Sequence, residues 1–166
     1  MDLKILSVHK DINQSKFDAL AEMDNRLVRM NNIVLRGLDE SDGTVDERLA
    51  NDNKVVEQLF DVLNVDPKIV METKRLGKIT ANKNRPRLLR VSLQSSTQKS
   101  ELFRKAKRLK NSRFKNVYVH PDLTPMQRDL NFKLRREMKE RRERGEDVMI
   151  INGAVRSRSE KQSFRK

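Results

Sequence analysis

The sequence predicts an α+β protein, and three observations favour that class. Residues 3–30 contain neither proline nor glycine and carry apolar residues at helical spacing. In residues 88–93, apolar side chains alternate with Arg90 and Ser92, the period of two that a half-buried strand requires. Near the end of the chain, Asn152-Gly153 separates two apolar runs, which is a strong signal for a β-hairpin. With 166 residues and 36% hydrophobic content, the chain can bury one compact core and a small appendage.

The first 30 residues are expected to form one helix with a partial coiled-coil pattern. In a heptad frame the second half of the seam is apolar, whereas the first half is interrupted by His9, Asn13 and Lys16. This pattern indicates the C-terminal end of an oligomerising helix, and the alternative is a helix that packs on its own domain. The four apolar seam residues are Leu20, Met23, Leu27 and Met30.

A strand, a helix and a second strand follow. Residues 33–38 are expected to form a strand with Ile33 and Leu35 on one face and with Val34, Arg36 and Leu38 on the other. Thr44 and Glu47 form a capping-box pattern that opens a helix ending near residue 64. Residues 69–76 are expected to be the next strand. The apolar stripe of the helix comprises Leu49, Val56, Leu59, Phe60 and Leu63.

A strand, a helix and a strand complete this domain, residues 31–120. After the strand that ends at residue 93, a helix begins at Ser95, and residues 117–119 form a short fourth strand. The helix stripe is Leu102, Phe103, Ala106 and Leu109. The order is that of the ferredoxin-like βαββαβ fold, in which the first and third strands are adjacent and one sheet face stays open. On that face Arg36 and Arg90 would be neighbours, with Tyr118 on the edge strand beside them.

Residues 121–158 read as a separate basic unit. Thr124, Pro125 and Gln127 predict the start of a helix that runs to about residue 144, with a narrow stripe of Leu130, Leu134 and Met138. Cations crowd its other faces, Arg128 and Arg135 among them. The hairpin around Asn152-Gly153 follows, and residues 159–166 are expected to be a disordered basic tail.

Charge is divided unevenly along the chain. Residues 1–72 hold 9 lysines and arginines against 15 acidic residues, whereas residues 73–166 hold 28 against 9. This asymmetry favours a polyanion-binding half over a solvated basic surface. The absence of cysteine suits a reducing compartment, and no apolar run is long enough to span a membrane. We therefore expect a cytoplasmic or nuclear protein without a membrane partner.

Catalysis finds little support in the residues. His9 and His120 are far apart and share no motif, and no metal-ligand cluster or paired-carboxylate constellation is present. We expect no enzyme activity, no cofactor, no metal and no small-molecule substrate.

Binding of a single-stranded nucleic acid fits better, because lysine and arginine neutralise phosphates without reading bases. Three arginines, Arg85, Arg87 and Arg90, lie within six residues, and Lys78 ends the basic run before them. The aromatic-rich strand pattern of RNA-recognition domains is absent. Tyr118 is the candidate for stacking on a base, and packing at the sheet edge is its alternative role.

Four segments occur in an order that resembles a known family: residues 29–38 (Arg29-x-Asn-Asn-Ile-Val-Leu-Arg-Gly-Leu), 74–78 (Lys-Arg-Leu-Gly-Lys), 85–91 (Arg-Pro-Arg-x-Leu-x-Val) and 121–125 (Pro-Asp-Leu-Thr-Pro). Together they resemble the first-open-reading-frame proteins of LINE-type (non-LTR) retrotransposons, over about residues 20–158. The resemblance implies a trimerising coiled coil, an RRM-like domain and a basic C-terminal domain.

The resemblance also implies a function and site residues. The family binds single-stranded RNA or DNA with little sequence preference, forms ribonucleoprotein particles and acts as a nucleic-acid chaperone. On matching positions it implies contacts from Arg29, Asn31, Arg75, Arg85, Arg87 and Arg128. The coil of this chain is shorter than is usual in the family. The alternative function is a protein-interaction or oligomerisation module on an RRM-like scaffold.

Overall fold

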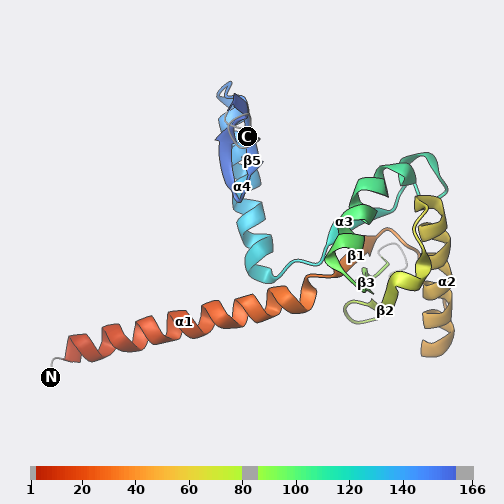
Figure 1. The fold of residues 1–166 in the computed structure, drawn as a ribbon, viewed down its shortest axis with the longest axis horizontal. Helices are drawn as coiled ribbons and strands as arrows, with labels where there is room; N and C mark the ends of the chain where they lie inside the picture. The colour runs from red at the N-terminus through yellow and green to blue at the C-terminus, as the bar shows by residue number, and fades with distance from the viewer. Residues whose placement is uncertain (1–2, 80–85, 160–166) are drawn as a thin grey trace. The chain divides into compact units, whose positions relative to one another are not determined.

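The computed structural model describes residues 3–79 and 86–159, with side chains from residue 12 onward. The fold is α+β, with four α-helices, a four-stranded antiparallel sheet and a two-stranded hairpin in the described residues (Figure 1). The chain divides into two compact units, residues 26–122 and residues 1–25 with 123–166. None of the helices in the described ranges is long and apolar enough to cross a membrane.

The unit of residues 26–122 is built on the four-stranded sheet. Its strands are β1 (Asn32–Arg36), β2 (Val70–Arg75), β3 (Leu89–Leu93) and β4 (Tyr118–Pro121), in the spatial order β2-β3-β1-β4. The first and third strands therefore lie side by side in the centre. All three pairings are antiparallel, and the ladder between β2 and β3 shifts register between Val70 and Glu72.

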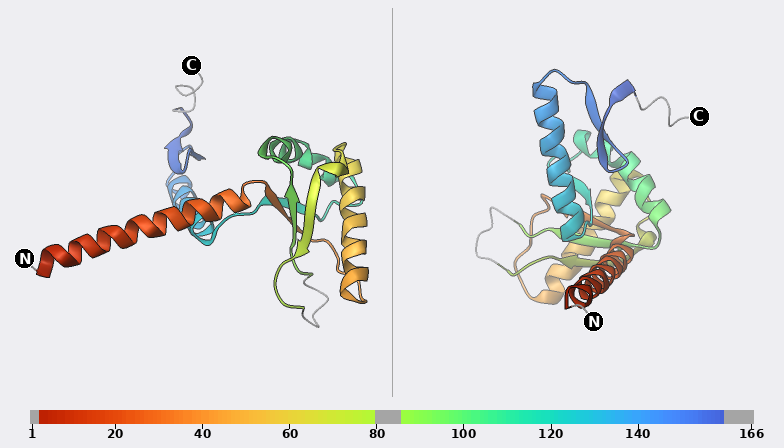
Figure 2. Two further views of the ribbon diagram at one scale, coloured as in Figure 1. Left: turned by 60° about the horizontal axis from the view of Figure 1, so that its bottom comes forward. Right: turned by 90° about the vertical axis from the view of Figure 1, so that its left-hand side faces the viewer.

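Two helices cover one face of this sheet (Figure 2). Helix α2 (Val45–Leu63) begins with the capping box that the sequence predicts, since Thr44 and Glu47 bond to each other's backbone N–H groups. Helix α3 (Ser96–Lys105) is capped by Ser95 and continues as the 3₁₀ helix η2 (Ala106–Asn111). The alternate residues of β3 are buried beneath them, as the period of two predicts. The core includes Ile33, Leu35, Val56, Leu59, Phe60, Leu63, Leu89, Val91, Leu93, Leu102 and Leu109.

Several local predictions were wrong in detail. Leu38 was placed opposite Ile33 and Leu35 but lies in the core, because Gly37 has φ of +90° and turns the chain after Arg36. Leu49 was expected in the apolar stripe of α2, but its side chain is 43% exposed. The second strand begins only after the 3₁₀ helix η1 (Pro67–Ile69), and the fourth extends to Pro121. Ala106 was expected in the same helix as Leu102, but it lies in η2, after the end of α3.

The second unit contains most of α1 (Leu3–Arg29), helix α4 (Pro125–Glu143) and the hairpin of β5 (Val148–Ile151) and β6 (Ala154–Ser157). Helix α4 opens with the predicted capping box of Thr124 and Gln127. Thr124 is fully buried and donates to Glu22 of α1 at 2.7 Å. The chain reverses at Asn152-Gly153, where both residues have positive φ, as a type I′ hairpin requires.

The narrow stripe expected on α4 is only partly buried. Leu134 is buried and Met138 is half-buried, whereas Leu130 is 45% exposed, contrary to the prediction. Arg141 and Arg142 donate to the carbonyls of Val155 and Val148 and so tie the end of α4 to the hairpin. The last seven residues of the expected tail lie outside the described residues.

Candidate nucleic-acid interface

The face of the sheet away from α2 and α3 carries a row of mostly polar and basic residues, which we call the open face. Residues that oppose each other in an antiparallel ladder project to the same side. The register aligns Lys74, Arg90, Val34 and His120 across all four strands, and it aligns Arg36 with Tyr118. Lys74, His120 and Arg36 are exposed. Val34, between Arg90 and His120, is buried.

Arg36 and Tyr118 are the most accessible predicted residues on the open face. The side chain of Arg36 has no hydrogen-bond or ion-pair partner in the part of the chain that the structure describes. Tyr118 is 59% exposed, so its ring can accept a stacked base. Gly37 follows Arg36 at a point where any Cβ would collide with the main-chain oxygen of Asn116. The glycine therefore allows β1 to end close to the segment that leads into β4.

Arg90 lies on the same face, but part of its guanidinium is occupied by an ion pair. Its Nη2 forms an ion pair with Glu72 of β2 at 3.1 Å, and its side chain is 26% exposed. Its Nε is buried and finds no acceptor among the described residues. Glu72 is 55% exposed, so this pair can open to a phosphate at small cost. The sequence reasoning missed Lys74 and His120, although extending the alternation along both edge strands would have placed them on this face.

Arg75 points to the opposite side of the sheet and serves the fold. Its guanidinium pairs with Asp52 of α2 at 2.6 Å, with both side chains at most 6% exposed. It also donates to three main-chain carbonyls, those of Leu38, Asp39 and Arg87, at 2.7–2.9 Å. The guanidinium of Arg75 is therefore engaged within the fold.

Arg87 is also engaged within the unit. It binds Glu40 through two nitrogens and donates to the carbonyl of Gly77 at 3.1 Å. The hydrogen bonds from Arg87 hold the pKa of Glu40 below its ordinary value, although burial opposes this effect. The same pair raises the pKa of Arg87. Arg87 therefore fixes the acidic turn 39–42 against β2 and β3.

Arg29 and Asn31 stand where α1 passes into β1. Arg29 forms an ion pair with Asp122 at 2.9 Å, and Asp122 also accepts from Asn32 at 3.1 Å. Lys99 of α3 donates to the carbonyl of Met30 at 2.7 Å, and burial lowers the pKa of Lys99. The half-buried Asn31 has an Oδ1 without a partner in the described ranges. The junction is thus held by a polar network rather than by apolar packing.

The remaining predicted residues belong to other parts of the chain than the strands of the open face. Lys78 is exposed beyond the end of β2, and Arg85 lies outside the described residues. Arg128 and Arg135 belong to the other unit, where both are exposed on α4. Arg128 donates to the carbonyl of Leu123 at 3.1 Å. Arg135 has no partner within the described part of the chain.

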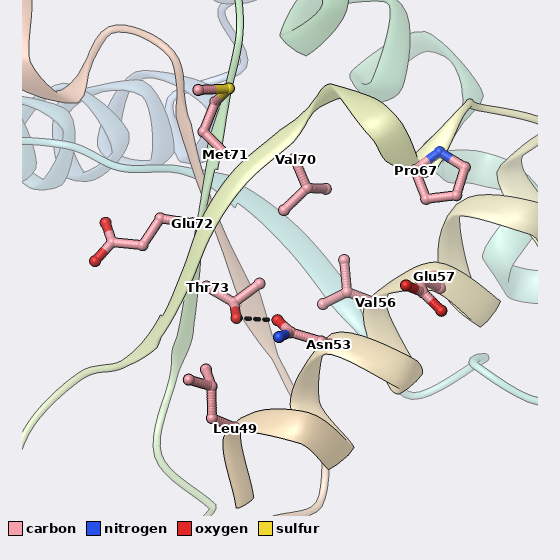
Figure 3. Close-up of a pocket in the computed structure, with 9 residues that line it drawn as sticks. All are labelled: Leu49, Asn53, Val56, Glu57, Pro67, Val70, Met71, Glu72 and Thr73. Atoms are coloured by element: carbon pink, nitrogen blue, oxygen red, sulfur yellow. Dashed lines mark hydrogen bonds between the residues drawn. The ribbon is translucent and has the colours of Figure 1, made fainter. Parts of the chain in front are cut away.

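A pocket of about 400 Å³ opens between α2 and β2 (Figure 3). Thr73 hydrogen-bonds Asn53 across it, and Met71 and Leu49 line its rim. Its lining includes the carboxylates of Glu57 and Glu72 and contains no lysine or arginine. This charge does not suit a phosphate, so the pocket is not a candidate for binding nucleic acid.

The described residues hold no group of histidine, cysteine or acidic side chains that could bind a metal ion. No protein-family model matches the chain, and a search of curated proteins finds no match.

Proposed function

We propose that this chain is a non-enzymatic protein that binds single-stranded nucleic acid, mainly RNA, with little sequence specificity. The observation that carries the proposal is the open face, where Arg36, Tyr118, Lys74, Arg90 and His120 project from the side of the sheet opposite to α2 and α3. An RNA strand on this face would contact cations through its phosphates and one ring through a base.

The expected lack of sequence specificity follows from the composition of the open face. Arginine and lysine supply electrostatic attraction that every sequence shares. Tyr118 is the single phenylalanine, tyrosine or tryptophan in the four strands, and a base of any kind can stack on its ring. The strand order β2-β3-β1-β4, with the first and third strands central, supports an RRM-like assignment for residues 31–120.

Oligomerisation through α1 is the second part of the proposal. Five large apolar side chains of its second half are 57–77% exposed: Phe17, Leu20, Met23, Leu27 and Val28. Burying such a stripe against other copies in a coiled coil would remove apolar surface from water. A trimer, which the family resemblance implies, would present several weak sites to one strand and so raise its affinity by avidity.

The biological setting is proposed on the resemblance. A LINE-type retrotransposon origin would make the nucleic acid the RNA of the element, held in cytoplasmic or nuclear ribonucleoprotein particles. Weak, exchangeable phosphate contacts also suit a nucleic-acid chaperone, because strands must be released to pair again. Domain boundaries at residues 30, 120 and 158 remain part of the same proposal.

Binding of labelled 20-nucleotide strands, followed by fluorescence anisotropy, tests the function. We expect single-stranded RNA of unrelated sequences to bind with similar affinity, and we expect affinity to fall steeply as salt rises from 50 to 200 mM. Protein purified at low salt should carry excess absorbance at 260 nm that nuclease removes. An affinity that does not depend on salt concentration, or binding confined to one sequence, would contradict the proposal.

The exposed apolar side chains of α1 also favour a second candidate, a protein-interaction module without a physiological nucleic acid. That function predicts a clean ultraviolet spectrum, no anisotropy change with any strand, and self-association or partner capture that depends on Leu20 and Leu27. Arg36→Ala distinguishes the two candidates. It should weaken binding of RNA if the chain binds nucleic acid, and it should leave self-association or partner capture unchanged if the chain is a protein-interaction module.

A further inference from the structure

Helix α4 carries an exposed aromatic ring that the packing of its unit does not explain. Phe132 is 66% exposed, although it lies in the middle of a regular helix. The face that packs against the hairpin is marked by the buried Leu134 and the half-buried Met138. Two residues correspond to about 200° around an α-helix, so Phe132 projects away from Leu134 and from the hairpin.

Arginines surround this ring on the helix surface. Residues three and four apart are neighbours on a helix, so Arg128, Arg135 and Arg136 flank Phe132 on both sides along the axis. Arg128 and Arg135 are about 10 Å apart along that axis, since each residue rises about 1.5 Å. A ligand that runs along this face would meet a cation, then the ring, then two more cations.

The arginines of this helix face are largely free to bind a ligand. Arg135 has no partner among the described residues, and Arg128 contacts only a main-chain carbonyl there. Arg136 forms an ion pair with Glu140 at 3.3 Å, but both side chains are more than half exposed, so the pair is weak. The nearest acid, Asp129, is matched by Lys133 at 2.7 Å.

We propose that Phe132, with Arg128, Arg135 and Arg136, forms a second site for single-stranded nucleic acid, in which a base stacks on the ring and the arginines hold the neighbouring phosphates. The proposal rests on the proposed function and adds a stacking residue from a different unit of the chain. The occupant follows from charge complementarity, because an exposed ring among arginines suits a chain that alternates flat bases with anionic phosphates. We expect no base selectivity at this ring.

Alanine substitution tests the contribution of the ring. In the full-length chain, Phe132→Ala should weaken binding of a 20-nucleotide uridine strand by about 5- to 150-fold, the range for loss of one stacked base. The matched control is Leu130→Ala, which removes an exposed apolar side chain from another side of the same helix and should leave affinity unchanged. Far-ultraviolet circular dichroism checks that both variants retain their helices.

A strand of abasic sugar-phosphate separates stacking from charge. The wild type and Phe132→Ala should bind this strand equally, because it offers phosphates and no bases. An equal loss on both strands would mean that the substitution acts through the fold or the charges, and it would overturn the stacking role.

Tryptophan fluorescence gives a direct readout. The chain contains no tryptophan, so Phe132→Trp introduces the only indole. Its emission should be quenched when the uridine strand binds, and binding should be as tight as in the wild type. The emission of Leu130→Trp should not change.

The outcomes distinguish the two proposals. If the wild type binds no strand, the proposed function fails. If the wild type binds but Phe132→Ala binds equally well and Phe132→Trp is not quenched, only the second site is overturned, and a protein contact would then account for the exposed ring.

Discussion

Arg36 and Tyr118 oppose each other in the ladder of β1 and β4, on the sheet face opposite to α2 and α3. One supplies a cation without a partner in the described residues, and the other supplies an exposed ring. Because opposed residues in an antiparallel pair project together, a base that stacked on Tyr118 would bring its phosphate towards Arg36. The pair therefore offers a group for each part of a nucleotide, a ring for the base and a cation for the phosphate.

The first prediction concerns this pair. Tyr118→Ala should weaken binding of single-stranded RNA by about 1–3 kcal/mol, the usual contribution of one stacked base. Tyr118→Phe should bind like the wild type, because the ring rather than the hydroxyl makes the contact. A double-mutant cycle with Arg36→Ala, measured by anisotropy, should give a nonzero coupling energy. Strict additivity would mean that the two side chains contact different nucleotides.

The second prediction separates binding arginines from structural ones. Arg36→Ala should lower the slope of log affinity against log salt by about 0.7, the value for one phosphate on a single strand. Arg87→Ala should leave this slope unchanged and lower stability instead, since Glu40 already occupies its guanidinium. A reduced slope for Arg87→Ala would show that this pair opens for the ligand.

The third prediction concerns Arg75. Removing one partner of a buried ion pair leaves an uncompensated charge, so Arg75→Ala should lower the free energy of unfolding by about 3–5 kcal/mol. Urea titration measures this effect, and Tyr118 is a built-in probe because it is the single tyrosine and the chain has no tryptophan. Lys78→Ala is the control: this exposed cation near the end of the same strand should change stability by less than about 0.5 kcal/mol.

The fourth prediction is a dependence of stability on pH. The pKa of Glu40 is lower in the folded state than its ordinary value of 4.5, chiefly because Arg87 donates hydrogen bonds to it. A carboxyl group with a lowered pKa stabilises the fold above its unfolded pKa and loses that contribution as pH falls through the folded pKa. Glu40→Gln should therefore be less stable than the wild type at pH 7, and the difference should shrink below about pH 4.5.

The control for this pH effect removes the partner. In an Arg87→Ala background, the pH-dependent effect of Glu40→Gln should be smaller, as measured by urea unfolding at several pH values, because the Arg87 side chain is the largest cause of the lowered pKa of Glu40. A pH-dependent difference of undiminished size there would assign the lowered pKa of Glu40 to another group.

The elements that sequence reasoning located best are those fixed by residues close in the chain. Thr44 with Glu47 and Thr124 with Gln127 are three residues apart, and both form the hydrogen bonds that their spacing predicts. Asn152-Gly153 fixes the hairpin because its positive φ values are a local property. Such signals need no knowledge of the tertiary structure.

The role of each arginine was harder to predict from the sequence, because it depends on partners that are distant in the chain. Arg36 and Arg75 both appear as cations at strand ends, yet one is exposed and the other is buried against Asp52, 23 residues earlier. Whether a basic strand residue faces a helix or the open side depends on the register of the sheet. Leu38 shows the same limit, since the turn at Gly37 moves it from the expected face into the core.

The last prediction concerns self-association through α1. Leu20 and Leu27, seven residues apart on one side of the helix, are 57% and 62% exposed. If this stripe forms a coiled coil, light scattering should give a mass near three times the 19.5 kDa of the chain. Leu20→Glu with Leu27→Glu should shift the mass to that of one chain, because charge at the seam opposes burial. Asn25→Glu, at an exposed position off the seam, is the matched control and should leave the mass unchanged.

The same variants connect association to binding. The double variant should bind a long RNA far more weakly than the wild type, because avidity is lost, yet it should bind a strand too short to reach two copies with unchanged affinity. Equal loss on long and short strands would show that α1 contacts RNA directly. A wild-type chain that stays monomeric in light scattering would contradict self-association, and the exposed stripe of α1 would then fit a different protein partner.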